Sequence, residues 1–480
     1  MKYLFLFLLI AGLSTSCYRM RKSNGGGQID AVAARTTIAA DIALHPGYTI
    51  EPVATGLTFP TGITFDESGN AYIVESGYSY GEVFTEPKLL RLQPNAAPVT
   101  IATGSKNGPW TGVTYLNNQF YIAEGGQLEG GRIIRIDKNG VQQILVSDLP
   151  TFGDHHTNGP VIKDGFIYFS LGTATNAGVV GLDNHEFGWL KRRPGFHDIP
   201  CADVTLLGKN YETPNPLTDD PNDKVHTGAF VPFGTLTHEG QVIKGSIPCS
   251  GSILRVPIDG GPVELVAWGF RNPFGLSFSP DGRLFTTENA FDERGSRKVW
   301  GTADVLWEVR PGSWYGWPDH SEGRILQDKE FKSPKAGIAD QLLKEFPQTP
   351  PKPTAHLGVH SSSNSFDFSR SDAFGFAGEA FITQFGDMAP DVGKVLSPVG
   401  FKVVRVNIQS GVIRDFATNK GKRNGPASRL KTGGLERPVA ARFDPNGTAL
   451  YVVDFGIMRM TNEGPQPQPA TGVVWKITKQ

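Results

Sequence analysis

The chain has 480 residues, and its 46 basic and 47 acidic side chains give a formal net charge of −1. A nucleic-acid-binding protein usually carries a basic surplus, so this charge argues against that class. Hydrophobic residues make up 39% and charged residues 19%, which excludes a collagen, a coiled coil and a polytopic membrane protein. The 58 glycines and 35 prolines are scattered along the chain, which predicts many short strands joined by turns.

The first residues predict export. A positively charged start is followed by the apolar run Tyr3–Leu13, which is too short to span a bilayer as a helix and is typical of a secretory signal. Small residues then lead into Cys17, an arrangement that resembles a bacterial lipoprotein signal. We therefore expect residues 1–16 to be a signal peptide and Cys17 to be lipidated, with ordinary cleavage beside an incidental cysteine as the alternative. Residues 17–46 are expected to be a flexible tether. The protein would then lie in the periplasm or cell envelope and be held at a bacterial membrane by its lipid alone.

Two cysteines remain beyond this segment, Cys201 and Cys249. In an exported protein they could form a disulfide, and two free thiols are the alternative. The sequence has no Cys-x-x-Cys-His motif, so no c-type haem is attached to this chain. A redox reaction would need a separate electron acceptor.

A strand–turn–strand unit recurs six times along the chain. Each copy has an apolar alternating strand, a polar turn and a second strand. The copies are Pro60–Glu75, Pro109–Glu124, Thr157–Leu171, Pro273–Glu288, Asn364–Thr383 and Pro438–Val453. A third strand follows each copy, at Lys88–Leu92, Gly131–Ile136, Ser252–Pro257, Val305–Val309, Lys402–Ile408 and Gly472–Ile477.

Six units that cannot each bury both faces alone predict an all-β fold, a six-bladed β-propeller over residues 47–480. Two stacked β-sandwiches are the alternative, and they would not explain so regular a repeat. The long gaps Gly172–Gly251 and Pro311–Ser363 are expected to be loop insertions on one face of the propeller. Lys335–Phe346 is the segment that most resembles a helix.

Polar residues beside the first strands of a propeller converge on its axis, although they are far apart in sequence. Asp154, His155 and His156 precede the third unit, where an imidazole could act as an acid–base group oriented by Asp154, or the pair could be structural. Arg271 precedes the fourth unit. Its planar guanidinium suits a bidentate contact with a carboxylate, and a structural salt bridge is the alternative.

Acidic residues end several of the predicted strands. Glu288–Glu293 gathers carboxylates, an amide and backbone carbonyls, which suit Ca²⁺, although a solvated acidic turn has the same composition. Arg437 precedes the sixth unit and is a second candidate for contact with an anion. Glu75, Glu124 and Glu288 end three second strands in the same way. Converging carboxylates of this kind would suit a Ca²⁺-dependent hydrolase such as a lactonase, and solvated strand ends are the alternative.

Taken together, these motifs resemble the glucose/sorbosone dehydrogenase family, the soluble quinoprotein sugar dehydrogenases. The resemblance spans residues 49–478. The residues that carry it are Asp154–Thr157, Gly172–Asn176, Gly269–Leu276 and Trp314–Pro318. The Gly172–Asn176 loop and the run Val403–Val406 are closer to the sorbosone branch than to the glucose branch.

The resemblance implies oxidation of a sugar, aldehyde or alcohol by hydride transfer to pyrroloquinoline quinone, with Ca²⁺ as the metal. It implies that His155 is the general base and that Arg271 is a catalytic residue in contact with the quinone. It further implies cofactor contacts from Asn107, Asn176, Arg271, Asn272 and Arg437, and metal ligation by Ala290, Phe291 and Asp292.

Three positions depart from the family pattern. Val439 stands where the glucose enzymes carry a second arginine, Gln384–Asp387 where they carry a lysine, and His360–Ser363 where an apolar loop is usual. Each charge-assisted contact contributes about 1.5–3 kcal/mol, so the loss of two cations predicts weaker binding of a trianionic cofactor. A non-catalytic binding propeller anchored to a membrane is therefore the alternative function, beside the lactonase-type hydrolase.

Overall fold

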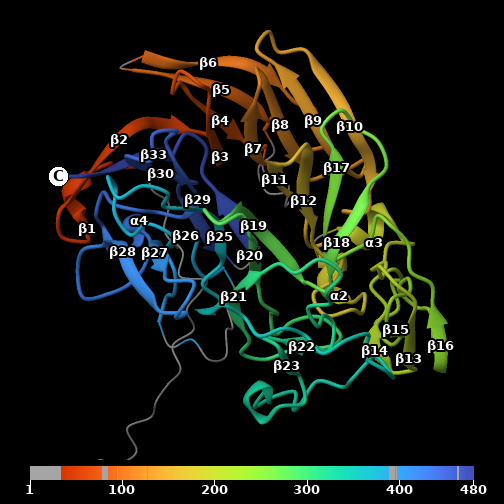
Figure 1. The fold of residues 1–480 in the computed structure, drawn as a ribbon. Coiled ribbons are helices and arrows are strands. Elements are labelled where there is room, and N and C mark those ends of the chain that lie inside the picture. The colour runs from red at the N-terminus through yellow and green to blue at the C-terminus, as the bar shows by residue number, and fades with distance from the viewer. Residues whose placement is uncertain are drawn as a thin grey trace, which may run out of the picture.

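The computed structural model describes residues 34–77, 85–94, 96–126, 128–186, 188–388, 395, 397–461 and 464–480. Six sheets surround a central axis, so the predicted all-β six-bladed propeller is confirmed (Figure 1). Among the described residues, no helix is long and apolar enough to cross a membrane. The predicted signal peptide, with Cys17 and the first part of the tether, lies outside the described residues.

Each blade begins with a strand at the axis, and its next strands follow outward. Blades 1 and 2 consist of β3 (Pro60–Phe65), β4 (Ala71–Glu75), β5 (Lys88–Gln93), β6 (Ala96–Thr103), β7 (Trp110–Leu116), β8 (Gln119–Glu124), β9 (Gly131–Asp137) and β10 (Gln142–Leu149). Blades 3 and 4 consist of β11 (Thr157–Lys163), β12 (Phe166–Leu171), β17 (Ser252–Pro257), β18 (Glu264–Trp268), β19 (Asn272–Phe278), β20 (Leu284–Asn289), β21 (Ala303–Glu308) and β24 (Ala355–Val359).

The last two blades each recruit a strand from the start of the chain. Blade 5 consists of β25 (Ser363–Phe368), β26 (Ala380–Gln384), β27 (Lys402–Val406), β28 (Ile413–Asn419) and β1 (Ile42–Leu44). Blade 6 consists of β29 (Pro438–Phe443), β30 (Ala449–Asp454), β33 (Gly472–Lys479) and β2 (Tyr48–Leu57). The hairpin β31 (Met458–Thr461) and β32 (Gly464–Pro467) and the short helix α4 (Ala427–Leu430) lie outside these sheets.

Buried inner strands and side-chain-capped turns explain why the repeated sequence folds in this way. All six residues of β3 are buried, and its register on β4 pairs Ile63 with Ile73. In the turn that joins them, Asp66 accepts hydrogen bonds from the backbone N–H groups of Ser68 and Asn70, 3.0 and 2.9 Å away. Such an aspartate stabilises a tight turn locally, so each unit encodes its own hairpin.

The ring is closed by pairing the start of the propeller with its end. β2 runs antiparallel to β33, from the pair Tyr48 and Lys479 to the pair Leu57 and Gly472. The tether predicted for residues 17–46 is wrong in its last part, because η2 (Ala39–Asp41) and β1 already belong to the folded body. Ile42 is buried against the aromatic core of blades 5 and 6, which holds this segment in place.

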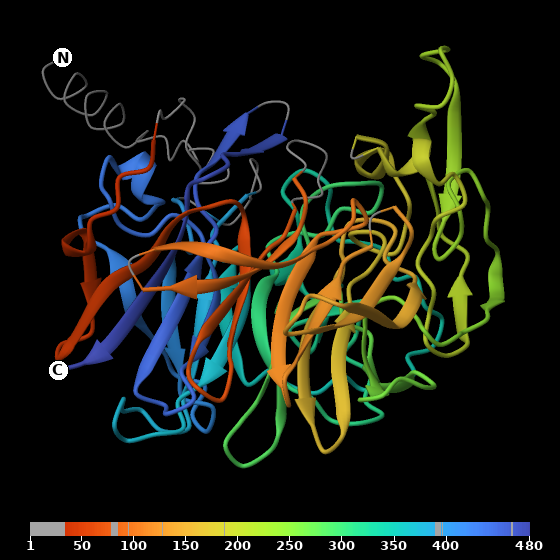
Figure 2. The same cartoon turned by 90° about the horizontal axis from the view of Figure 1, so that it is seen from above.

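The two long insertions pack together beside blades 3 and 4 (Figure 2). The first contains α2 (Leu182–Glu186), α3 (Trp189–Arg192), β13 (Val204–Leu207), β14 (Asn210–Pro214), β15 (Lys224–Gly228) and β16 (Glu239–Ile243). The second contains β22 (His320–Ser321), β23 (Arg324–Ile325) and η3 (Lys329–Phe331). Trp314 pairs with Trp268 of β18, and Trp317 meets the ring of Phe230 edge-on at 5.6 Å. The aromatic loop of the second insertion therefore covers the outer edge of blade 3 and joins the two insertions.

The helix predicted over Lys335–Phe346 is wrong. This segment is extended or irregular, and Gly337 within it has a φ of 77°. Its backbone is bound by neighbouring segments, because Leu342 O accepts from Leu207 N and the N–H of Lys344 donates to Thr205 O. Leu342 and Leu343 are buried in the apolar cluster between the insertions. Tertiary hydrogen bonds and burial thus outweigh the local helix propensity.

Cys201 and Cys249 form a disulfide that closes a loop in the first insertion, with Cα atoms 5.1 Å apart. Cross-linking residues 48 positions apart restricts the unfolded chain by about 4 kcal/mol in the loop-entropy account. We expect the double variant Cys201→Ala/Cys249→Ala to lose about 2–4 kcal/mol of unfolding free energy, measured by urea denaturation. Reduced wild-type protein should match the variant. Equal midpoints for the oxidised wild type and the variant would contradict the prediction.

Candidate active site

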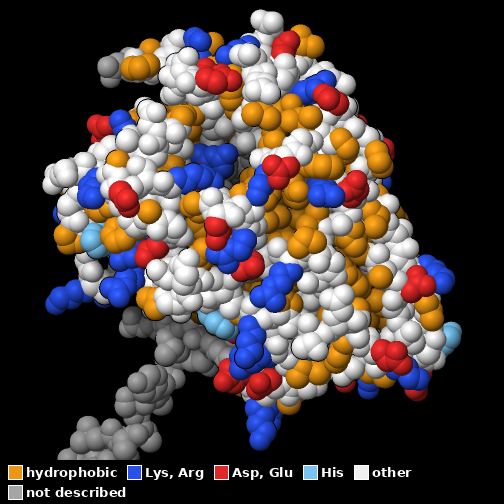
Figure 3. Space-filling view, viewed as in Figure 1, with side chains coloured by type: hydrophobic (Ala, Val, Ile, Leu, Met, Phe, Trp, Pro, Cys, Tyr) orange, Lys and Arg blue, Asp and Glu red, His pale blue; other side chains and the backbone are white. Residues whose placement is uncertain are grey.

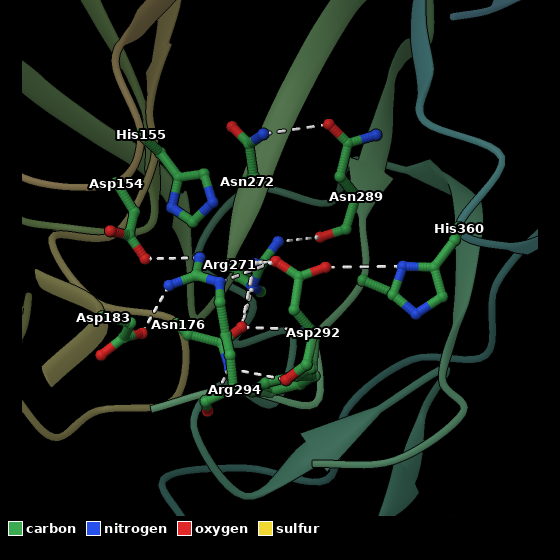
Figure 4. A network of polar contacts seen from close by, with 12 residues as sticks. Asp154, His155, Asn176, Asp183, Arg271, Asn272, Asn289, Asp292, Arg294 and His360 are labelled. Atoms are coloured by element: carbon green, nitrogen blue, oxygen red, sulfur yellow. Dashed lines mark hydrogen bonds and ion pairs between the residues drawn. The ribbon is translucent and has the colours of Figure 1, made fainter. Parts of the chain in front are cut away.

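The candidate site lies on the face where inner strands begin and second strands end. Asp154 and His155 precede β11, Arg271 precedes β19, and Asp292 lies in the loop that follows β20. Asn272 is the first residue of β19. The propeller thus brings together side chains from segments more than 100 residues apart in sequence (Figure 4).

His155 is buried and held in one orientation. Its Nδ1 lies 2.9 Å from the carbonyl oxygen of Thr173 and 3.2 Å from the hydroxyl of the same residue. Because a carbonyl oxygen can only accept, Nδ1 carries the proton and Nε2 is left with a lone pair. Nε2 has no hydrogen-bond partner among the described residues. A Cβ on Gly172 would approach the His155 Cβ to 2.2 Å, so the imidazole needs a glycine beside it.

The protonation state of His155 follows from its surroundings. Burial lowers its pKa well below the ordinary value of histidine, and the positive charges of Arg271 and Arg294 lower it further. The imidazole is therefore neutral at neutral pH and able to accept a proton. The neighbouring His156 packs against Gly125 of blade 2, and burial lowers its pKa to about 4.

Arg271 is fixed by neutral and acidic partners. Its Nε and Nη2 lie 3.1 and 2.9 Å from Asn176 Oδ1, and Nη2 also lies 2.9 Å from Asp292. Its Nη1 donates to the carbonyl oxygen of Asn289 at 3.3 Å. Asn176 in turn donates to the carbonyl of Asp292. The predicted residues Arg271 and Asn176 thus belong to the site, but each binds the other.

Arg294 connects three carboxylates below the imidazole. It pairs with Asp154 at 2.6 Å, Asp183 at 2.5 Å and Asp292 at 3.1 Å. His360 reaches Asp292 from the opposite side, with its Nδ1 3.4 Å from Oδ1 (Figure 4). Five charged groups, three acidic and two basic, therefore support the floor of the site.

The acidic members of this network have divergent pKa values. Burial raises the pKa of Asp154 to about 6 despite the charge of Arg294. Burial also acts to raise the pKa of Asp292, but Arg271, His360 and Arg294 hold it well below the usual value. Asp292 is therefore ionised and serves as the counter-ion of both arginines.

Two amides lie beside the charged network of the site (Figure 4). Asn272 Nδ2 donates to Asn289 Oδ1 at 3.0 Å, and Asn289 Nδ2 donates to the carbonyl of Ser363 at 2.8 Å. Both side chains are half-buried. The predicted residue Asn272 therefore lies where it could contact a bound molecule.

Two of the predicted cofactor residues have other partners. Asn107 is buried and donates to Glu124 and to the carbonyl of Gly130, so its amide orders a loop of blade 2. Arg437 is fully buried, its guanidinium lies near the rings of Phe385 and Phe401, and Nη1 donates to the carbonyl of Gly386. Both side chains make these contacts within the propeller.

The predicted Ca²⁺ loop also makes hydrogen bonds and ion pairs within the protein. The N–H of Ala290 donates to Asp304, that of Phe291 donates to Thr302, and the carboxylate of Asp292 is paired as described above. Within the described ranges, no group of three or more His, Cys, Asp and Glu side chains is placed to hold a metal ion. These contacts do not involve the carbonyl oxygen of Ala290, and the predicted Ca²⁺ ligation by the carbonyls of Ala290 and Phe291 stays a prediction.

The carboxylates behind the lactonase interpretation accept hydrogen bonds, most of them from their own blade. Glu75 accepts from the N–H of Thr58, and Glu124 from the indole of Trp110. Glu288 accepts from the N–H of Arg271 at 2.5 Å and from the indole of Trp307. Asp454 occupies the same position in blade 6 and accepts from the N–H of Arg437. These strand-end carboxylates each accept structural hydrogen bonds, and the lactonase interpretation stays an untested alternative.

Sequence reasoning missed Arg294, Asp183 and Asp198. Arg294 stands two residues after Asp292, and its proximity to the acidic loop was the available signal. Asp183 and Asp198 lie inside the first insertion, which carries no repeat pattern. Asp198 accepts from the N–H of Ala174 and the hydroxyl of Thr175, and so fixes the loop that bears Thr173.

The role of Asp198 in holding the loop that bears Thr173 can be tested through the pH dependence of stability. Burial raises its pKa to about 7, so the folded protein keeps a proton that the unfolded chain releases near pH 4. The stability of the wild type should therefore fall by about 1.4 kcal/mol per pH unit between roughly pH 4 and 7 relative to Asp198→Asn. Urea midpoints of both proteins at pH 5 and 7.5 measure this difference. A stability difference that is independent of pH would contradict the assignment.

No protein-family profile and no curated protein matches the chain. Solved structures do match its fold. One is the pyranose dehydrogenase PQQ domain from Coprinopsis cinerea in its holo form, with a TM-score of 0.57, 16% identity, and coverage of 94% of this chain and 100% of that one. Another is the family AA12 carbohydrate-active enzyme from Trichoderma reesei, with a TM-score of 0.55, 16% identity and the same coverage.

A bacterial protein is similar to the same degree. The soluble aldose sugar dehydrogenase from Escherichia coli, in its apo form, gives a TM-score of 0.52 at 14% identity over 90% of this chain and 100% of that one. At these identities the likeness concerns the architecture. The chain has the six-bladed propeller fold that these soluble sugar dehydrogenases share.

Proposed function

We propose that this protein is a sugar or alcohol dehydrogenase in which His155 removes the hydroxyl proton of the substrate. The observation that carries the proposal is the neutral imidazole of His155, oriented by the Thr173 carbonyl with Nε2 unoccupied, beside Arg271 and Asn272. The shared fold with a PQQ-containing pyranose dehydrogenase domain and an aldose sugar dehydrogenase supports the same reaction class.

The residues present fit the reactive end of a quinone cofactor. A neutral base, a guanidinium and two half-buried amides lie on one side of the site, the donor and acceptor types that a quinone and a hydroxyl require. Pyrroloquinoline quinone would accept a hydride equivalent there when bound. Arg271 and Asn272 are the residues that would hold its carbonyl oxygens.

The carboxylate end of that cofactor would meet fewer cations than the family pattern of the glucose enzymes provides. Arg271 and Arg294 already pair with Asp292, and Arg437 is buried against backbone carbonyls. Each absent charge-assisted contact removes about 1.5–3 kcal/mol, so we expect a dissociation constant in the low micromolar range. Ca²⁺ would have to recruit carbonyl oxygens of the Ala290–Asp292 loop.

The side chains of this protein account for the movement of the proton. Nε2 of His155 accepts it from the substrate hydroxyl, while Nδ1–H stays bound to the Thr173 carbonyl and keeps the ring in place. Asp154, beside it in the chain, is held by Arg294 and Asn184 and fixes the loop from below. Arg271 supplies positive charge where negative charge develops.

A titration tests the proposal directly. Metal-stripped protein is titrated with pyrroloquinoline quinone and Ca²⁺, followed by absorbance, and then assayed for dye reduction with a panel of sugars. Saturable binding and sugar-dependent bleaching are expected. No binding at about 50 µM cofactor would overturn the proposal and favour the non-catalytic binding propeller, for which the paired state of Arg271 and Arg294 is the supporting observation.

Cellular placement is part of the same proposal. The apolar run Tyr3–Leu13 and Cys17 support export and lipid attachment, and the electron acceptor would be a separate molecule. Metabolic labelling with a fatty acid, compared between wild type and Cys17→Ser, measures the lipid. Equal labelling of the two proteins would show that Cys17 is not the attachment site.

A further inference from the structure

A cavity opens at the end of the propeller axis opposite the candidate active site. It has a volume of about 640 Å³ and is lined where the inner strands of blades 2 to 6 end and turn. β19 starts at Asn272 in the candidate active site and ends at Phe278 in the wall of this cavity. A strand of seven residues is roughly 20 Å long, so β19 separates the cavity from the candidate active site by about that distance.

Basic side chains mark this region of the surface. The space-filling view shows a recess near the centre of the ring, with Lys and Arg side chains at its edge (Figure 3). The basic residues that line the cavity are Lys163, Arg370 and Arg442, and the acidic ones are Asp164, Asp367 and Asp444.

Arg442 crosses the central channel. It lies on β29 of blade 6, yet its Nη2 is 3.5 Å from the hydroxyl of Thr114 on β7 of blade 2. Its Nε is 3.9 Å from Asp367 of blade 5. Both contacts are long, and the remaining N–H groups of the guanidinium have no partner within the described part of the chain. Arg442 is thus a partly buried cation whose N–H groups make only long contacts.

The acidic lining residues make their short hydrogen bonds to groups other than Arg442. Asp367 accepts from Ser277, from the N–H of Phe443 and from Arg370 at 3.1 Å, so its oxygens are shared among several donors. Asp444 is occupied by Thr448 and the N–H of Ala449 in its own turn. Asp164 is exposed at a turn.

The other two cations also donate to neutral acceptors, and Arg370 is in addition paired with Asp367. Lys163 Nζ donates to the carbonyl of Gly282 at 2.6 Å and lies 4.9 Å from the centre of the Phe278 ring. Arg370 Nη2 donates to the carbonyl of Phe278 at 2.7 Å. Three cations thus line a cavity that is wide enough for a monosaccharide-sized molecule, and of the three Arg442 has the longest contacts.

We propose that this cavity binds a small hydroxylated oxyanion, a carboxylate or a phosphate, through the guanidinium of Arg442. The planar fork of arginine matches two oxygens of such a group, and the long contacts of Arg442 leave that fork available. Lys163 and Arg370 add charge from the rim, and the hydroxyl of Thr114 accepts or donates to a ligand hydroxyl. This site would act independently of His155.

Isothermal titration calorimetry with inorganic phosphate and with gluconate tests the proposal on the full chain. Binding to the wild type is expected in the millimolar range or tighter, and Arg442→Gln should weaken it at least about tenfold. Arg442→Lys, which keeps the charge and loses the fork, should fall between the two. Arg135→Gln is the matched control, since Arg135 is a partly exposed, paired arginine on an outer face.

The outcomes separate this site from the active site. Binding that persists in His155→Ala and is lost in Arg442→Gln supports it, and the tighter of the two probes identifies a phosphate or a sugar acid as the ligand type. Thermal unfolding of Arg442→Gln checks that the variant is folded. Absence of binding of both probes to the wild type at about 10 mM, or equal binding to wild type and Arg442→Gln, would overturn the proposal.

Discussion

Replacing His155 by alanine is expected to lower the turnover of sugar oxidation by about 10²–10⁴-fold, the contribution typical of a positioned general base. The physical reason is that Nε2 of His155 is the acceptor that the fold orients through the Thr173 carbonyl. The cofactor should still bind with similar affinity, because Arg271 and Asn272 remain. Steady-state dye reduction by the protein reconstituted with pyrroloquinoline quinone and Ca²⁺ measures the effect.

The pH profile sharpens this test. The pKa of His155 lies well below the ordinary value, so the imidazole is deprotonated throughout neutral pH. Turnover should therefore lack the inflection near pH 6.5 that an unperturbed histidine gives. His238→Ala, on the exposed first insertion, is the control and should keep wild-type turnover. Undiminished activity in His155→Ala would show that another group takes the proton.

Replacing Arg297 by methionine is expected to lower the free energy of unfolding by about 3–5 kcal/mol, because it leaves a buried carboxylate without its counter-ion. Arg297 pairs with Asp319 at 2.7 Å, and both side chains are almost fully buried. The same guanidinium donates to the carbonyls of Ala177, Pro318 and Asp340, so it joins both insertions to the loop after β20. Urea denaturation followed by tryptophan fluorescence measures the loss.

A double-mutant cycle isolates the ion pair. Asp319→Asn keeps an acceptor for the N–H groups of Leu342 and Leu343 but removes the charge. Arg297→Met combined with Asp319→Asn should therefore be less destabilised than the sum of the two single variants, by about 1–3 kcal/mol. Strict additivity, or a loss below about 1 kcal/mol in Arg297→Met, would show that the pair contributes little.

The architecture could be predicted from sequence because its information is local and repeated. Each blade encodes an alternating strand, a capped turn such as that of Asp66, and a second strand, so six copies specify a ring. The insertions lack this redundancy. Lys335–Phe346 has helical composition, yet β13 and Asp319 bind its backbone in an extended form, and those partners lie far away in sequence.

The site could be predicted only in part, for a related reason. His155, Arg271 and Asn272 stand at strand starts, where the propeller geometry brings residues to the axis. What the sequence did not reveal is how the charges pair. Asp183 binds Arg294 from 111 positions away, and Arg437, predicted to contact an anion, is buried against the carbonyl of Gly386. Pairing of this kind depends on distances that no local pattern encodes.

The closure of the ring by β2 and β33 has a consequence for the covalent order of the chain. Gln480 N donates to the carbonyl of Gly47 at 2.9 Å, so the end of the chain lies against the residue that precedes β2. A short peptide linker could therefore join Gln480 to Gly47 without disturbing the pairing of β2 with β33. New termini opened in the largely exposed turn between β9 and β10 should then give a circularly permuted protein with the same six blades.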